Sequence, residues 1–481
     1  MTKWMLAVAA INASSVPAAM AQPEGGGATV GSEVTEALAL EDLSPQELAQ
    51  VQRNRDHFGL PADVDTIADR LDTADAEQAM AVFGMPLSED EFAVVAARQQ
   101  FGIDVEPLLQ WVQEHPEYAG AAFRLGRDGG LDVYVTTDAL AAEVRKRGEA
   151  LGLDHPIAAI VVEHSWQELQ KVMDDAWAAA PEEVHSVGID TSANRVTVEI
   201  HQSVVDRAEV RLDIEEAVDV PVTVTAAPAP DAQACNNRQD CWAPKLRPGV
   251  RLTMGSRVFD VGRRCTMGFH VRVDGTNDEQ FLTAGHCARA TSASVTSFRR
   301  AYHWSLPGVA GDQGRIGTQV ATAFVTASAP NYGFDVARFQ MPDKRATDRI
   351  YRISPSTMKI VTNLRYPREN DYICFSPSVS RNVAAPESAT LSCGRITVED
   401  TYWTISSQNN NCGNCRVRGA RHDVGTTTSG DSGAPVWYPV LNLEGPAQAR
   451  PVGLHVTSLG GMTRIHDALV VLNAHIALTN Q

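Results

Sequence analysis

The chain has 481 residues, of which 44 % are hydrophobic, and its formal net charge is -18. This length allows two to four domains, and the hydrophobic content is enough to fill sizeable cores. Beyond the N-terminus no run approaches the 18 or more apolar residues of a membrane-spanning helix, so the sequence excludes a helical membrane anchor there and predicts a soluble product.

The charge is divided unevenly along the chain. Residues 1–234 carry 14 Lys+Arg and 41 Asp+Glu, whereas residues 235–481 carry 27 and 18. An acidic half followed by a basic half indicates two modules that attract each other, or a basic module that binds an anionic partner. Surface charge that only keeps each half in solution is the remaining interpretation.

All eight cysteines lie in the second half, at Cys235, Cys241, Cys265, Cys287, Cys374, Cys393, Cys412 and Cys415. An even number confined to one module is typical of a disulfide framework formed outside the cytosol. A zinc site is disfavoured because the two closely spaced pairs lie about 170 residues apart. A redox role for the last pair is disfavoured because no thioredoxin-like βαβ pattern surrounds it. We therefore expect no metal and no cofactor.

Residues 1–21 have the pattern of a secretory signal peptide. Lys3 precedes a short apolar run, and small residues follow, ending at Ala21. The pattern predicts cleavage near Ala21 and secretion. The segment 22–43 begins with a Gly-rich stretch and is predicted to be a flexible tail.

Residues 44–221 are predicted to form an α+β unit. Helical patterns run from a cap at Ser44 to about residue 113. After them come two strands joined by a Gly129-Gly130 turn, a helix, a strand, a second helix and a hairpin. The Ala- and Pro-rich segment 222–234 is predicted to be a linker open to proteolytic processing.

Residues 235–481 are predicted to be all-β. From Arg247 onward, short runs of β-forming residues alternate with Gly, Asn, Asp or Pro. Only the C-terminal segment, which starts near Ile465, has a helical pattern. Many short strands without helices between them are typical of a sandwich or of barrels.

A serine in the stretch GDSG, residues 430–433, is a candidate nucleophile. A serine hydroxyl needs a neutral imidazole to accept its proton and a carboxylate to orient that imidazole. His286 ends the apolar run FLTAG and precedes Cys287, whose covalent bond would give a general base rigid support. Asp335 lies within an apolar run, where an ionised carboxylate needs a partner. The other histidines of this half lack such an anchor, and most of them are interpreted as surface or core-edge residues: His270, His303, His422, His455, His466 and His475.

The motifs TAGHC, DVA after an aromatic residue, and GDSG resemble those of the chymotrypsin-like serine peptidases. They occur in the order His286, Asp335, Ser432, with gaps of 49 and 97 residues. The stretch CTMGFHV at Cys265, followed by FLTAGHC, is similar to the bacterial streptogrisin and alpha-lytic protease branch. Upstream segments resemble the pro-region of that branch, so the resemblance covers most of residues 45–481.

The resemblance implies two antiparallel six-stranded β-barrels of the trypsin type, preceded by the α+β pro-region, with the site between the barrels. Ser432 would attack the peptide carbonyl, His286 would accept and return its proton, and Asp335 would orient the imidazole. The backbone N–H groups of Gly430 and Ser432 would form the oxyanion hole.

The resemblance also implies disulfides between Cys265 and Cys287 and between Cys374 and Cys393. For the remaining cysteines we pair Cys235 with Cys241 and Cys412 with Cys415. Thr426 occupies the floor of the family's primary pocket, which argues against Lys or Arg before the cut and favours a hydrophobic or medium-sized residue. Val456 replaces a serine that usually contacts substrate.

The sequence thus predicts a secreted serine endopeptidase, made as a zymogen, that hydrolyses peptide bonds through an acyl-enzyme intermediate. Its expected partners are protein and peptide substrates and its own pro-region, which assists folding and inhibits until cleaved. We expect no nucleic-acid or membrane partner and a monomer after processing. A protease-like binding protein that has lost catalysis is disfavoured by the intact triad. A lipase or esterase of the α/β-hydrolase type is disfavoured because it requires Gly-x-Ser-x-Gly and the order Ser, Asp, His.

Overall fold

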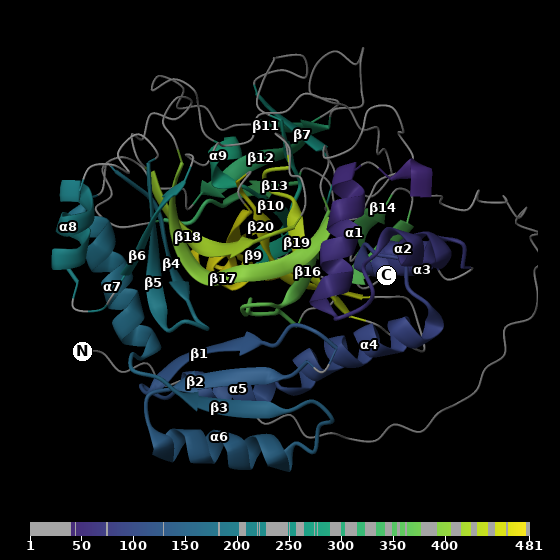
Figure 1. The fold of residues 1–481 in the computed structure, drawn as a ribbon. Helices are drawn as coiled ribbons and strands as arrows, with labels where there is room; N and C mark the ends of the chain where they lie inside the picture. The colour runs from purple at the N-terminus through teal and green to yellow at the C-terminus, as the bar shows by residue number, and fades with distance from the viewer. Residues whose placement is uncertain are drawn as a thin grey trace, which may run out of the picture. The chain divides into compact units, whose positions relative to one another are not determined.

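The structure is a computed structural model (Figure 1). It describes residues 40–43, 45–73, 76–127, 129–180, 183–201, 208–218, 220, 222–227, 249, 251–255, 264–273, 275–276, 278–288, 300–303, 315–322, 333–341, 349–353, 356–360, 363–376, 392–405, 415–424, 431–440, 448–457 and 460–477. The predicted signal peptide, 1–21, lies outside these segments, as do Cys235, Cys241, Cys412, Thr426 and Gly430.

The chain from residue 45 to residue 113 is mainly helical, as predicted. Its helices are α1 (Pro45–His57), α2 (Val64–Leu71), α3 (Ala76–Phe83), α4 (Glu89–Asp104) and α5 (Glu106–Gln113), preceded by the 3-10 helix η1 (Leu40–Asp42). A capping box starts α4: the Ser88 hydroxyl accepts from the Glu91 N–H, and the Glu91 carboxylate accepts from the Ser88 N–H. None of the helices in the described segments is both long enough and apolar enough to span a membrane.

A three-stranded sheet follows the helices. Its strands are β1 (Tyr118–Phe123), β2 (Leu131–Val135) and β3 (Ile157–Val161), and α6 (Asp138–Ala150) connects the last two. β1 and β2 pair antiparallel around the Gly129-Gly130 turn, where both glycines have positive φ. β2 and β3 pair in parallel, which requires the crossover helix. The predicted order of elements is confirmed here.

A second α+β segment contains α7 (Trp166–Ala179), β4 (Val184–Asp190), β5 (Arg195–His201), α8 (Ala208–Glu216) and β6 (Val222–Ala227). β4 and β5 form the predicted hairpin. β6 pairs in parallel with β5 and occupies the first six residues of the segment predicted to be a linker. The alternation VTVT fits a strand. At the other boundary, η1 lies within the segment predicted to be a flexible tail, and Leu40 and Leu43 pack against a core.

Six antiparallel strands of the second half close into a barrel. In order around it they are β16 (Tyr372–Phe375), β17 (Ser392–Ile405), β18 (Cys415–His422), β21 (Gly461–Arg464), β20 (Gln448–His455) and β19 (Pro435–Val440), and β19 pairs with β16 again. A hairpin of β14 (Arg349–Ile353) and β15 (Ser356–Ile360) joins it through β20.

A second sheet contains eight strands. In order they are β22 (Ala474–Ile476), β9 (His270–Val273), β10 (Glu279–Thr283), β13 (Ala337–Gln340), β12 (Arg315–Thr322), β11 (Arg300–His303), β7 (Arg251–Gly255) and β8 (Arg264–Thr266). The short α9 (Gly285–Ala288) follows β10, and α10 (Ile465–Val471) precedes β22. Within the described segments this sheet does not close on itself, so the second predicted barrel stays a prediction.

The two halves of the chain share a sheet and a core. Thr401, Tyr402 and Trp403 of β17 pair antiparallel with β4, so the β4–β5–β6 sheet continues the barrel sheet (Figure 1). One core contains Phe58, just after α1, and Phe83 of α3 together with barrel residues. Ion pairs in the described segments also join acidic residues of the first half to arginines of the second: Glu106–Arg365 at 3.0 Å, Glu106–Arg450 at 2.8 Å, Asp174–Arg416 at 2.8 Å and Glu199–Arg421 at 2.7 Å.

Candidate active site

His286 is held at the end of β10 by the short helix α9. The next residue, Cys287, forms a disulfide with Cys265 of β8. This bond fixes the backbone on one side of the imidazole, and the strand fixes it on the other. Both sequence expectations for His286, a strand end and a covalent anchor, are confirmed.

Asp335 makes two hydrogen bonds with His286. Its Oδ2 lies 2.6 Å from His286 Nδ1, and its Oδ1 accepts from the His286 backbone N–H at 2.7 Å. Its own carbonyl accepts from the Thr463 hydroxyl at 3.2 Å. Asp335 and His286 are both buried. The carboxylate therefore fixes the ring orientation and favours the tautomer with a proton on Nδ1, which leaves Nε2 as a base.

Ser432 lies in a tight turn just before β19. Its carbonyl accepts from the Thr266 N–H at 2.8 Å, and its hydroxyl donates to the Val456 carbonyl at 3.3 Å. Thr266 adjoins Cys265, and His286 adjoins Cys287. The nucleophile candidate and the base candidate are thus each tied within one residue of the same disulfide.

Gly433 is the residue that the turn requires. Its φ is +91°, and a Cβ there would lie 2.3 Å from Thr283 Oγ1 and 2.4 Å from the Thr266 carbonyl oxygen. No L-residue with a side chain fits this combination of conformation and space.

We predict that Gly433→Ala lowers the free energy of unfolding by about 3 kcal/mol or more, from backbone strain plus overpacking. Gly275→Ala is the matched control, because Gly275 also has a positive φ, +78°, but a Cβ added there would meet no atom within 4 Å. Denaturant unfolding measures both variants. Equal losses would show that the contacts around Gly433 contribute nothing.

Of the other predicted site residues, the structure describes Val456 and four cysteines that form disulfides. Val456 is buried, and its carbonyl accepts from Ser432. The disulfides Cys265–Cys287 and Cys374–Cys393 are both present. Three sulfur or nitrogen atoms of Cys265, His286 and Cys287 lie within 4.8 Å of one another, but sulfurs joined in a disulfide are not thiolate ligands for a metal.

A buried histidine pair beside Ser432 was missed by the sequence interpretation. His422 of β18 and His455 of β20 are core residues, not surface or core-edge residues, and they flank Phe375 with ring centroids 6.1 and 5.2 Å away. His455 is next to the turn: its carbonyl accepts from the Gly433 N–H and its N–H donates to the Ala434 carbonyl, both at 2.8 Å.

Hydrogen bonds fix the tautomer of each ring in this pair. The Val424 N–H donates to His422 Nδ1 at 3.2 Å, so the proton of a neutral His422 ring lies on Nε2. His422 Nε2 lies 3.1 Å from His455 Nδ1 and donates to it. The His455 proton must then lie on Nε2, which is buried and has no hydrogen-bond partner in the described segments.

Burial keeps both rings neutral. It lowers the pKa of His422 to about 3, and it lowers the pKa of His455 well below the usual value, with His422 and His286 adding to the effect. The pair therefore has one neutral N–H donor without an acceptor in the described segments, the Nε2–H of His455. The signal was present in the sequence only as two histidines 33 residues apart, and no spacing rule connects them.

Comparisons with known proteins give weak likenesses. No family model and no curated protein matches the chain. Among solved structures, the chain is similar to a Nocardiopsis protease (16 % identity, TM-score 0.33) and to an alpha-lytic protease homolog (17 %, 0.31). It is also similar to "a glutamic acid specific serine protease" that "utilizes a novel histidine triad in substrate binding" (16 %, 0.30). Each match covers 48 % of this chain and 98 %, 99 % and 100 % of those chains, respectively. All three are proteases by name.

Proposed function

We propose that the protein is a secreted serine endopeptidase made as a zymogen, with His286, Asp335 and Ser432 as its catalytic triad. The observation that carries the proposal is the pair of hydrogen bonds from His286 to a buried Asp335 carboxylate. An imidazole held this way at both its backbone and its ring is what general-base activation of a hydroxyl needs, and Ser432 would turn its hydroxyl from the Val456 carbonyl toward His286 Nε2 to use it.

In the proposed reaction, Ser432 Oγ attacks the peptide carbonyl and His286 Nε2 takes its proton. Asp335 stabilises the imidazolium that forms, and His286 then protonates the leaving amine. Water attacks the acyl-enzyme in the second half of the reaction, with His286 again as the base. The backbone N–H groups of Gly430 and Ser432 are proposed to stabilise the oxyanion, each contributing about 3–4 kcal/mol to the barrier reduction.

We propose that residues 44–221 act as a pro-region that docks on residues 235–481. The four ion pairs between acidic and basic halves and the shared β17–β4 pairing support this proposal. Complementary charge favours association of the two parts. The predicted signal peptide supports secretion, and processing would fall within 228–234, the part of the predicted linker beyond β6.

We infer further that the substrate residue before the cut is acidic, in place of the hydrophobic or medium-sized residue that Thr426 alone suggests. A buried N–H without an acceptor costs about 1–3 kcal/mol, and the His455 Nε2–H is such a donor in the described segments, on a residue whose backbone is hydrogen-bonded to Gly433 and Ala434 of the turn. A substrate carboxylate supplies the strongest acceptor for it. His422 is a positioning residue, since it fixes the His455 tautomer.

A fluorophosphonate probe tests the catalytic proposal. Processed wild-type protein should be labelled, and Ser432→Ala should abolish the labelling. No labelling of processed wild-type protein would favour a binding protein that has lost catalysis. Labelling with cleavage of ester lipids, but not peptides, would favour the esterase alternative.

Peptide substrates that differ only by Glu or Gln before the cut test the acidic preference. We predict that kcat/KM is at least about tenfold higher for Glu, and that His455→Val removes the difference while probe labelling of Ser432 persists. Equal rates for the two substrates in a labelled enzyme would overturn the substrate inference alone.

A further inference from the structure

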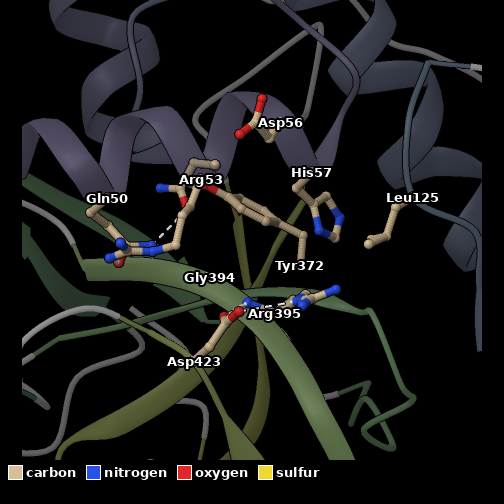
Figure 2. A pocket seen from close by; sticks show the side chains of 10 residues that line it. Gln50, Arg53, Asp56, His57, Leu125, Tyr372, Gly394, Arg395 and Asp423 are labelled. Carbon is tan, nitrogen blue, oxygen red and sulfur yellow. Dashed lines mark hydrogen bonds and ion pairs between the residues drawn. The ribbon is translucent and has the colours of Figure 1, made fainter. Parts of the chain in front are cut away.

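A pocket of about 180 Å³ lies between α1 and the barrel (Figure 2). None of the residues proposed for catalysis lines it. Its lining comes from both halves of the chain: Gln50, Arg53, Asn54, Asp56, His57, Leu125, Tyr372, Gly394, Arg395 and Asp423.

His57, the last residue of α1, is the buried titratable group of this pocket. The residue is 8 % exposed. Its ring packs against Phe58 and Tyr372, with centroids 4.7 and 5.2 Å away, so it touches both halves of the chain. His57 Nδ1 is buried and has no hydrogen-bond partner in the described segments. A neutral ring fits this apolar contact, and a charged ring would lack compensation.

The charged groups around His57 are mainly cationic. Arg53 and Asp56 come from α1 and are exposed, and Arg98 of α4 is buried. Arg395 of β17 lies opposite, and both oxygens of Asp423 accept hydrogen bonds from it, at 2.7 and 3.0 Å. In the described part of the chain, no carboxylate oxygen lies within 4.0 Å of a His57 ring nitrogen.

These surroundings oppose protonation. Burial, followed by the charges of Arg98 and Arg395, lowers the pKa of His57 to about 3. The C-terminal end of α1 acts in the opposite direction, because helix C-termini favour cations. Burial and the two guanidinium groups outweigh it.

We propose that His57 is an acid-sensitive latch between the two halves of the chain: its protonation releases α1 from the barrel and loosens the docked N-terminal half. Acid, rather than cleavage alone, would then weaken the contact of the helices with Tyr372 and the strands around it. The proposal concerns docking, so it stands whether or not Ser432 is a nucleophile.

The sign of the effect follows from linkage. In the docked state the His57 ring is neutral because its pKa is lowered to about 3, whereas a released His57 has its ordinary pKa of 6.5. The docked state is therefore favoured fully above about pH 6.5, and docking weakens about tenfold for each pH unit below that, down to about pH 3.

Amide hydrogen exchange on the full chain carrying Ser432→Ala measures how the protection of α1 depends on pH. After correction for intrinsic exchange rates, the protection of α1 amides should fall about tenfold per pH unit between pH 6 and pH 4.5. Amides of β19 and β20, inside the barrel, should keep their protection over this range. In His57→Phe, whose ring can pack between Phe58 and Tyr372, protection of α1 should not depend on pH.

His466→Gln is the matched control, because that histidine is exposed and should leave the pH dependence unchanged. Buried carboxylates are the competing cause: burial raises the pKa of Glu369 and Asp371, and raises that of Glu399 to about 7. A pH dependence that persists in His57→Phe would assign the effect to them and overturn the latch.

A second measurement does not depend on any variant. Exchange of the imidazole C2 proton, followed by mass spectrometry, reports the pKa of each histidine in the folded chain. A docked His57 should not titrate above pH 4. A His57 ring that titrates near 6.5 while α1 stays protected would contradict the proposal.

Discussion

An Asp335→Asn variant is expected to keep its fold and to lose roughly 10⁴-fold in kcat, the scale of loss when the orienting carboxylate of a triad becomes an amide. The asparagine Oδ1 can still accept from the His286 N–H, as the Asp335 Oδ1 does at 2.7 Å. Its NH₂ group, however, would face His286 Nδ1 and donate to it. The ring proton would move to Nε2, and His286 could no longer accept the proton of Ser432.

The measurement is kcat/KM on a peptide substrate together with the rate of fluorophosphonate labelling. Asp467→Asn is the matched control, because Asp467 also pairs with a basic side chain, Arg464, but outside the proposed triad. Full activity in Asp335→Asn would remove Asp335 from the mechanism. Absence of activity in the wild-type protein would instead contradict the proposed function.

A Glu106→Gln variant should lower the free energy of unfolding of the full chain by about 2 kcal/mol, since the Glu106 side chain is 21 % exposed but its loss leaves the buried Arg450 charge without its carboxylate partner. Glu106 accepts from Arg365 at 3.0 Å and from Arg450 at 2.8 Å. Arg365 is 1 % exposed and Arg450 is 6 % exposed. Arg365 keeps its ion pair with Asp371 in the variant. Arg450 loses its carboxylate partner, so most of the lost stability should come from Arg450.

Glu143→Gln is the control for this prediction. Glu143 pairs with Arg147 on an exposed helix face, where both side chains are nearly half exposed, and such a pair contributes about 0.5 kcal/mol. Denaturant unfolding in the Ser432→Ala background measures both. Equal effects would mean that the Glu106 contacts do not hold the halves together.

The sequence predicted local structure well where residues carry a strong local signal. The Gly129-Gly130 turn, the β4–β5 hairpin and the start of α10 at Ile465 were all predicted. α8 was missed, because Val210, Leu212 and Ile214 in AEVRLDIEE alternate with polar residues, a period that is typical of a strand and not of a helix. β6 was assigned to a linker because Ala and Pro in the same segment outweighed its alternating valines and threonines.

Contacts distant in sequence were predictable only where a motif marked them. His286 and Asp335 are 49 residues apart, yet an anchoring cysteine and a carboxylate in an apolar run identified both. His422 and His455 lack any such mark, since their contact depends on the closure of β18, β21 and β20 into a barrel. His57 was not identified either, because its environment is built by residues from α4, β16 and β17.

The pairing of β4 with β17 covers a strand edge that the proposed processing would expose. Between Thr401 and Trp403, β17 has β18 on one side and β4 on the other. Removal of the N-terminal half would turn this stretch into an edge strand with unpaired N–H and C=O groups, beside Tyr402 and Trp403, which are now buried. Such an edge is a template for pairing with another chain. If processing removes the N-terminal half, we expect the β-sheet domain to self-associate through this edge, in place of the monomer expected from the sequence. Its sedimentation coefficient should then rise with protein concentration, whereas that of the precursor should not.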